Sequence, residues 1–131
     1  MMAHGHTLTV LSVELAVCRL DPSAVVPEWA WYGSFVSLTR TREELSVVCE
    51  VDAVPPDAHC VRGWRVLRVE GPLPFEMVGV LASLTTTLAQ AGVSVFAIST
   101  YDTDYLLVRL ADLPRATAAL RQAGHRLAHE G

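Results

Sequence analysis

The stretch EGPLPFEMVGVLASLTTTLAQAGVSVFAIST (Glu70–Thr100) contains the pattern that decides the fold. From Met77 to Ala91, apolar residues recur at alternating intervals of four and three, which predicts one stripe of an amphipathic helix over residues 75–91. Gly92 then supplies a helix stop. Residues 93–100 are β-branched and aromatic, so they predict a strand after the helix.

The residues on either side extend this pattern into a complete unit. Residues 64–70 alternate apolar and polar side chains and predict a preceding strand. Residues 101–104 are turn formers, and residues 105–110 predict a returning strand. A second helix opens at Asp112 and stops at Gly124, and residues 125–129 predict a last short strand. The predicted order, β-α-β-β-α-β, is that of the ferredoxin-like unit.

The first half of the chain repeats part of this order. Residues 36–48 align without a gap on residues 96–108 as strand, polar turn and strand. The first half has fewer residues before this match, so its helix must be short, around residues 26–31. We therefore predict an α+β fold with two fused ferredoxin-like units, residues 7–60 and 61–131. The first unit is truncated, and together they form a shared antiparallel sheet with helices on one face.

Composition limits the functions that the chain can have. About half of the residues are hydrophobic (51%) and only 18% are charged, so a folded core is expected. The net charge of −4 gives no electrostatic reason to expect nucleic acid or an anionic membrane as a partner. Cys18, Cys49 and Cys60 lack metal-ligand spacing and are expected to be buried free thiols in a reducing cytoplasm.

Several segments together carry a resemblance to a known family. Residues 78–82 (VGVLA), 88–95 (LAQAGVSV) and 98–100 (IST) resemble the signature of the ACT domain. With residues 70–73 and 101–105, the chain resembles short tandem-ACT proteins related to the regulatory domains of aspartate kinases and to cytosolic arginine sensors.

The resemblance implies a regulatory sensor of small molecules, most often amino acids, with the ligand held at the seam between two ACT units. It implies one site per chain and neither a cofactor nor a metal. It also allows a homodimer or another protein as partner. By position, the implied ligand-binding residues are Glu70, Gly71, Pro72, Leu73, Ser99, Thr100, Tyr101 and Asp104, together with Ser46 and Val47 from the first half.

The chemistry of these residues suits an amino acid. A strand end beside a helix N-terminus offers unpaired N–H groups to a carboxylate, and Gly71 would let the backbone approach the ligand closely. The ammonium group needs an acidic partner, for which Asp104 or Glu70 could serve. A structural interpretation stays open, in which Gly71 only forms a tight turn and Asp104 only bonds its own backbone.

Other functions have less support in the sequence. No nucleophile, phosphate-binding or metalloprotease motif is present, so we expect no catalysis. The main alternative is an ACT scaffold that has lost its ligand and serves dimerisation or protein docking. The aromatic cluster Trp29, Trp31 and Tyr32 either fills the space left by the shortened helix or forms a surface for a partner.

Overall fold

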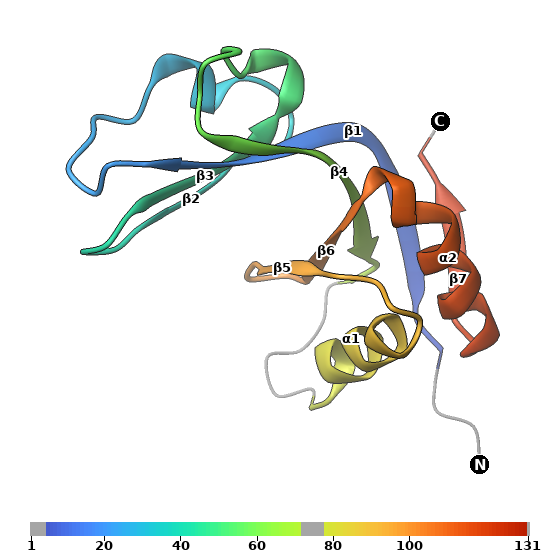
Figure 1. Cartoon of the computed structure of the whole chain (residues 1–131). Coiled ribbons are helices and arrows are strands. Elements are labelled where there is room, and N and C mark those ends of the chain that lie inside the picture. The colour runs from blue at the N-terminus through green and yellow to red at the C-terminus, as the bar shows by residue number, and fades with distance from the viewer. Residues whose placement is uncertain (1–4, 72–77, 131) are drawn as a thin grey trace. The chain divides into compact units, whose positions relative to one another are not determined.

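The computed structural model describes residues 5–71 and 78–130 and divides into two compact units (Figure 1). The first, which we call the helical unit, comprises the described residues of Met1–Ser12 and Arg65–Gly131. The second, the hairpin unit, comprises Val13–Trp64. Two long strands, β1 (Thr7–Leu20) and β4 (Cys60–Val69), contribute residues to both units.

The helical unit contains parts of β1 and β4 together with three shorter strands. These are β5 (Phe96–Ser99), β6 (Asp104–Arg109) and β7 (Arg126–His129). The hydrogen-bonded order is β7-β1-β4-β6-β5. β5 and β6 form an antiparallel hairpin, whereas β7 runs parallel to β1, with Thr7 opposite Arg126. The first residues of β1 therefore lie between β4 and β7.

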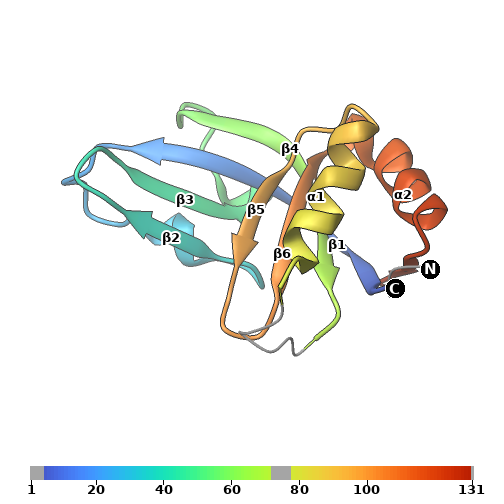
Figure 2. The ribbon, with the colours of Figure 1, turned by 90° about the horizontal axis from the view of Figure 1, so that it is seen from below.

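Two helices cover one face of these strands. They are α1 (Val80–Gln90) and α2 (Leu113–Gln122), and the 3-10 helix η3 (Leu110–Asp112) leads into α2. The helices lie next to each other (Figure 2). Apolar side chains from both helices and from alternate strand positions form one core: Leu8, Val10, Leu67, Val69, Val80, Leu84, Leu88, Leu106, Val108, Ala116 and Leu120. Burial of this apolar surface is the main driving force for folding of the unit.

The hairpin unit is built on β1 and the antiparallel hairpin of β2 (Ser37–Arg40) and β3 (Leu45–Glu50). Two 3-10 helices, η1 (Glu28–Trp31) and η2 (Val51–Ala53), flank the hairpin in sequence. A separate core contains Ala16, Cys18, Ala30, Leu45, Val47, Cys49 and Val54. The expected short helix in the first half is thus confirmed as the single 3-10 turn η1.

The structure corrects three of the sequence-based expectations about secondary structure and pairing. α1 begins at Val80 rather than at residue 75, because Gly79 has a φ of +86° and lies outside the helical region; residues 75–77 lie outside the described part of the chain. The sheet is not wholly antiparallel, since β7 pairs in parallel with β1. Residues 7–12, which we expected in the first unit, group in space with the helical unit.

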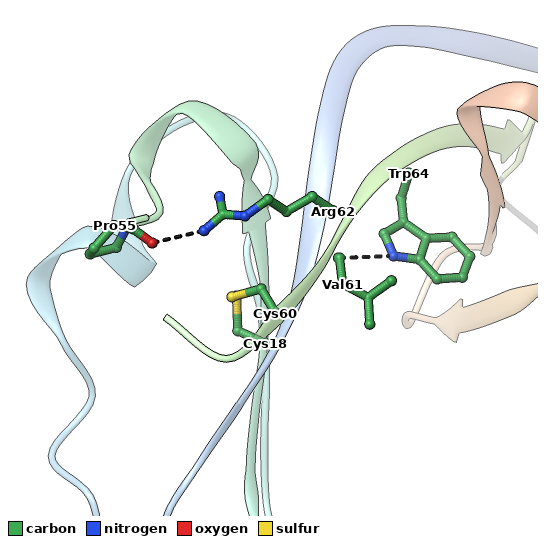
Figure 3. Close-up of a disulfide and its surroundings, with 6 residues drawn as sticks. All are labelled: Cys18, Pro55, Cys60, Val61, Arg62 and Trp64. Atoms are coloured by element: carbon green, nitrogen blue, oxygen red, sulfur yellow. Dashed lines mark hydrogen bonds between the residues drawn. A yellow bond between two sulfur atoms is a disulfide. The ribbon is translucent and has the colours of Figure 1, made fainter. Parts of the chain in front are cut away.

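The expectation of three free thiols was wrong for two of them. Cys18 and Cys60 form a disulfide with an S–S distance of 2.11 Å (Figure 3). The register explains the contact, because the backbone N–H of Arg19 donates a 3.0 Å hydrogen bond to the carbonyl of His59, which places the two cysteines on adjacent strands. Cys49 is free and buried, as expected.

Within the described residues, no helix is long and apolar enough to cross a membrane.

Candidate ligand-binding site

β4 and α1 are joined by a connection in which residues 72–77 lie outside the described part of the chain. β4 ends at Val69, and Glu70 and Gly71 follow as exposed residues. The described chain resumes at Val78, which is 94% exposed, and at Gly79. Among the described residues, no side chain caps α1, and its first turn has no acidic residue. The first N–H groups of a helix have no partner within the helix itself, and the helix dipole there favours an anion.

The turn between β5 and β6 carries a carboxylate in a fixed position. The Ser99 hydroxyl donates a 2.6 Å hydrogen bond to Oδ1 of Asp104. The backbone N–H of Thr100 donates a 2.8 Å hydrogen bond to the carbonyl of Thr103, which closes the turn. Tyr101 stands at the tip and is 79% exposed. Because a carboxylate can accept about four hydrogen bonds, Ser99 leaves Asp104 with capacity for a ligand.

A buried hydrogen bond brings this turn to the end of β4. The hydroxyl of Thr103, which is only 8% exposed, donates a 2.6 Å hydrogen bond to the carbonyl of Val69. Glu70 and Gly71, the next residues after Val69, therefore lie at the same end of the helical unit as the Ser99–Asp104 turn.

Glu70 is held as an ionised carboxylate. The Thr9 hydroxyl donates a 2.6 Å hydrogen bond to its Oε2, and Arg68 forms an ion pair with the same oxygen at 3.0 Å. The hydrogen bond from Thr9, followed by the hydrogen bond and the charge of Arg68, lowers the pKa of Glu70 below its usual value. The oxygen that carries these partners is occupied, which limits how Glu70 could contact a ligand.

The structure brings together most of the residues that the resemblance implied. Six of them lie at this end of the helical unit: Glu70, Gly71, Ser99, Thr100, Tyr101 and Asp104. Pro72 and Leu73 lie outside the described residues. Ser46 and Val47 lie on β3 in the hairpin unit, where Val47 is fully buried in the core. Ligand contact by any of these residues stays a prediction.

The hairpin unit contains a cavity that the sequence did not predict. In the hairpin unit, a cavity of about 410 Å³ is lined by Glu28, Trp29, Tyr32, Asp52 and Ala53. The aromatic residues were expected to fill space or to face a partner, and the structure gives Trp29 and Tyr32 a place in the cavity wall. Asp52 comes from a separate element, so no spacing in the sequence could have connected it with Glu28.

The part of the chain that the structure describes contains no group of three or more His, Cys, Asp or Glu side chains placed to hold a metal ion. Neither the end of the helical unit nor the cavity in the hairpin unit is therefore described as a metal centre.

Comparison with known proteins identifies the class to which this fold belongs. A family model described as an ACT domain matches residues 59–122, and a second model, described as an N-terminal domain, matches residues 14–57. The α+β fold is that of the small regulatory domains found in aspartate kinases. Through the match over residues 59–122, the chain belongs to the ACT-domain family.

Individual relatives agree with this assignment. The chain is similar to CASTOR3P from Homo sapiens, with 31% identity over 99 residues. That match covers 66% of this chain and 61% of CASTOR3P, so the chain spans about three fifths of that relative.

Two solved structures have the same fold. Protein Atu0741 from Agobacterium tumefaciens is 39% identical, with 98% of this chain and 96% of that chain covered and a TM-score of 0.92. The regulatory subunit of aspartate kinase from Thermus flavus is 10% identical, with 94% and 99% covered and a TM-score of 0.62. At that identity the second likeness is one of fold alone.

Proposed function

We propose that this chain binds a free amino acid at the end of the helical unit formed by the β4–α1 connection and the β5–β6 turn, and that it regulates without catalysis. The observation that carries the proposal is the N-terminus of α1, which no described side chain caps, together with the Thr103–Val69 hydrogen bond, which holds the Asp104 turn at the end of β4. A positive helix end and the carboxylate of Asp104 would together match the two charges of an amino acid.

Each charge of the ligand has a partner in this arrangement. The ligand carboxylate accepts hydrogen bonds from the first N–H groups of α1, where the helix dipole also favours a negative charge. The ligand ammonium donates to the remaining acceptor positions of Asp104. Charge-assisted hydrogen bonds of this kind contribute about 1.5–3 kcal/mol each, which is enough to select the ligand.

Regulation follows from differential affinity. A ligand that binds one conformation of the chain more tightly than another shifts the population toward that conformation, and a partner protein or a second copy of the chain then responds to the change. No chemical step is required.

A thermal-shift screen of the protein against each proteinogenic amino acid, confirmed by calorimetry, tests this function. A ligand at 100 times its dissociation constant should stabilise the protein by about 2.7 kcal/mol, which raises the melting temperature by several degrees. Asp104→Ala should abolish that shift, whereas Asp102→Ala, which changes the neighbouring exposed acid in the same turn, should preserve it. A ligand that binds Asp104→Ala with unchanged affinity would remove Asp104 from the site.

One observation favours a second candidate function, a ligand-free scaffold for dimerisation or docking. Both acids already have partners within the chain, since Thr9 and Arg68 engage Glu70 and Ser99 engages Asp104. If no amino acid shifts the melting temperature of well-folded protein, the scaffold is the better function. Sedimentation at several protein concentrations then measures whether the chain self-associates.

The cytoplasmic location expected from the sequence stays a prediction. The Cys18–Cys60 disulfide argues against it, because such bonds are rare in reducing compartments. Trapping the thiols with an alkylating agent in intact cells, followed by mass spectrometry, measures which redox state the protein has there.

A further inference from the structure

The cavity of about 410 Å³ in the hairpin unit has a distinctive lining. One wall comes from η1 and the residue after it, and carries Glu28, Trp29 and Tyr32. The other lining residues, Asp52 and Ala53, belong to η2. The volume lies within the range of small-molecule sites in proteins.

Both walls are fixed to the body of the unit. Ala30 of η1 is fully buried, and Val54, directly after η2, is 7% exposed, so each 3-10 helix is anchored in the same core. The carboxylate of Glu50 also joins the two walls, because its Oε2 accepts hydrogen bonds from the backbone N–H of Ser34 at 2.6 Å and from the Ser34 hydroxyl at 3.1 Å. Both segments that line the cavity are therefore anchored in one core.

The hydrogen bonds between Ser34 and Glu50 require a glycine at position 33. Gly33 has a φ of +96°, and any side chain there would collide with the Glu50 carboxylate. A glycine between Tyr32 and Ser34 thus lets the aromatic wall approach the segment that leads into Asp52.

The lining favours a positive charge. No hydrogen bond or ion pair joins the carboxylates of Glu28 and Asp52 to other residues in the described part of the chain, and both are exposed. The faces of Trp29 and Tyr32 attract cations through their ring quadrupoles. No basic residue lines the cavity. Two carboxylates without a third ligand do not make a metal site, whereas two carboxylates beside aromatic rings suit an organic cation that is flat or partly apolar.

We propose that this cavity binds an organic cation with a guanidinium or alkylammonium group, which stacks on Trp29 or Tyr32 and pairs with Glu28 and Asp52. The inference goes beyond the proposed amino-acid site, because it concerns residues of the other unit and needs no carboxylate on the ligand.

Agmatine, which has a guanidinium and an amine but no carboxylate, is the direct probe. Titration with agmatine should shift the indole N–H resonance of Trp29 in a saturable way at millimolar concentration. The indole of Trp64 provides an internal control, because it is buried and already donates a hydrogen bond to the carbonyl of Val61 (Figure 3). High salt should weaken the effect, since exposed charge pairs are screened.

The carboxylates are tested by isosteric substitution. The double variant Glu28→Gln/Asp52→Asn should bind agmatine about tenfold more weakly or not at all, because it loses both charges. Asp57→Asn, which removes an exposed acid of the same unit outside the cavity, should bind as the original chain does. All three changes are at exposed positions, so folding should be unaffected.

The source of the cation is distinguished with a second probe. N-acetylarginine amide carries the same guanidinium as a peptide-borne arginine, and tighter binding of this probe identifies a protein segment as the partner. Tighter binding of agmatine identifies a free amine. If neither compound shifts Trp29, or if the double variant binds both with unchanged affinity, the proposal is wrong. Asp104→Ala should leave agmatine binding intact, so failure here and failure of the amino-acid site are separable.

Discussion

Thr103 and Val69 are joined by a hydrogen bond of 2.6 Å from a nearly buried hydroxyl to a strand carbonyl. This bond fixes the β5–β6 turn against the end of β4. Neither partner of this bond is among the residues that the sequence implied for ligand contact, yet the bond holds Glu70 and Asp104 at the same end of the unit.

Thr103→Val should destabilise the protein by about 1–3 kcal/mol, because it keeps the branched shape of the side chain but leaves the carbonyl of Val69 without this donor. Urea unfolding followed by circular dichroism measures the change. Thr39→Val, on exposed β2, is the matched control and should stay within about 0.5 kcal/mol of the original chain. An equal effect of both variants would contradict the role assigned to Thr103.

Acidification should destabilise the helical unit through His125. Its Nδ1 accepts a 3.0 Å hydrogen bond from the backbone N–H of His6, and the two rings stack with centroids 5.9 Å apart. Burial, followed by the charge of His6, lowers the pKa of His125 below the usual 6.5.

The lowered pKa determines the direction in which stability changes with pH. The unfolded chain binds the proton more readily than the folded chain, so the stabilisation is complete above pH 6.5 and declines as the pH falls from there through the lowered pKa. The free energy of unfolding, measured by urea titration from about one pH unit above to about one pH unit below the ordinary histidine pKa, should show this decline. His125→Asn, which keeps an acceptor for His6, should flatten it, whereas His59→Asn in the other unit should not.

Reduction should destabilise the hairpin unit. The Cys18–Cys60 disulfide joins residues with a sequence separation of 42. Breaking a cross-link that closes a loop of this length lowers the free energy of unfolding by roughly 3–4 kcal/mol, because the unfolded chain gains entropy. The paired variant Cys18→Ser/Cys60→Ser should therefore melt at a lower temperature and become insensitive to reductant.

Thiol counting checks the same bond. Burial, followed by the charge of Glu50, raises the pKa of the Cys49 thiol, so Cys49 should react slowly with an alkylating agent in the folded protein. After unfolding without reductant, only Cys49 should be labelled, and reduction should expose the other two. Labelling of all three cysteines in unreduced, unfolded protein would show that the disulfide is absent.

Glu50→Ala should loosen the cavity wall, because Ser34 loses the acceptor for both its backbone N–H and its hydroxyl. We expect a loss of stability of about 1–2 kcal/mol and weaker agmatine binding by the NMR titration. Glu50→Gln retains a side-chain oxygen and should keep most of the stability and most of the agmatine binding of the original chain. Glu43→Ala, at an exposed acid in the same unit, is the control.

Much of the fold could be predicted because the second half has regular periodicity. Residues 105–110 and 125–129 were predicted as strands, and β6 and β7 confirm them to within one residue at each end. The start of α1 could not be predicted, since the apolar stripe continues through Gly79 and only the backbone conformation there interrupts the helix. The parallel pairing of β7 with β1 was also missed, because it joins the two ends of the described chain.

The candidate site could be predicted in part because some of its residues are close together in the sequence. Ser99 and Asp104 face each other across a short turn, so local sequence placed them together. Their link to Glu70 through Thr103 spans 34 positions and depends on sheet topology. The disulfide and the pairing of Glu28 with Asp52 in one cavity have the same origin, contact between distant segments, and no local pattern signals either.

The course of β1 has a consequence for any attempt to dissect the chain. Because its first residues insert between β4 and β7, a fragment that starts at Cys60 would lack a central strand and would leave β4 and β7 without their shared neighbour. Such a fragment should aggregate rather than fold. An intact helical unit would require a chimera in which residues 5–12 are rejoined to residue 65, because this unit is built from two separate segments of the chain.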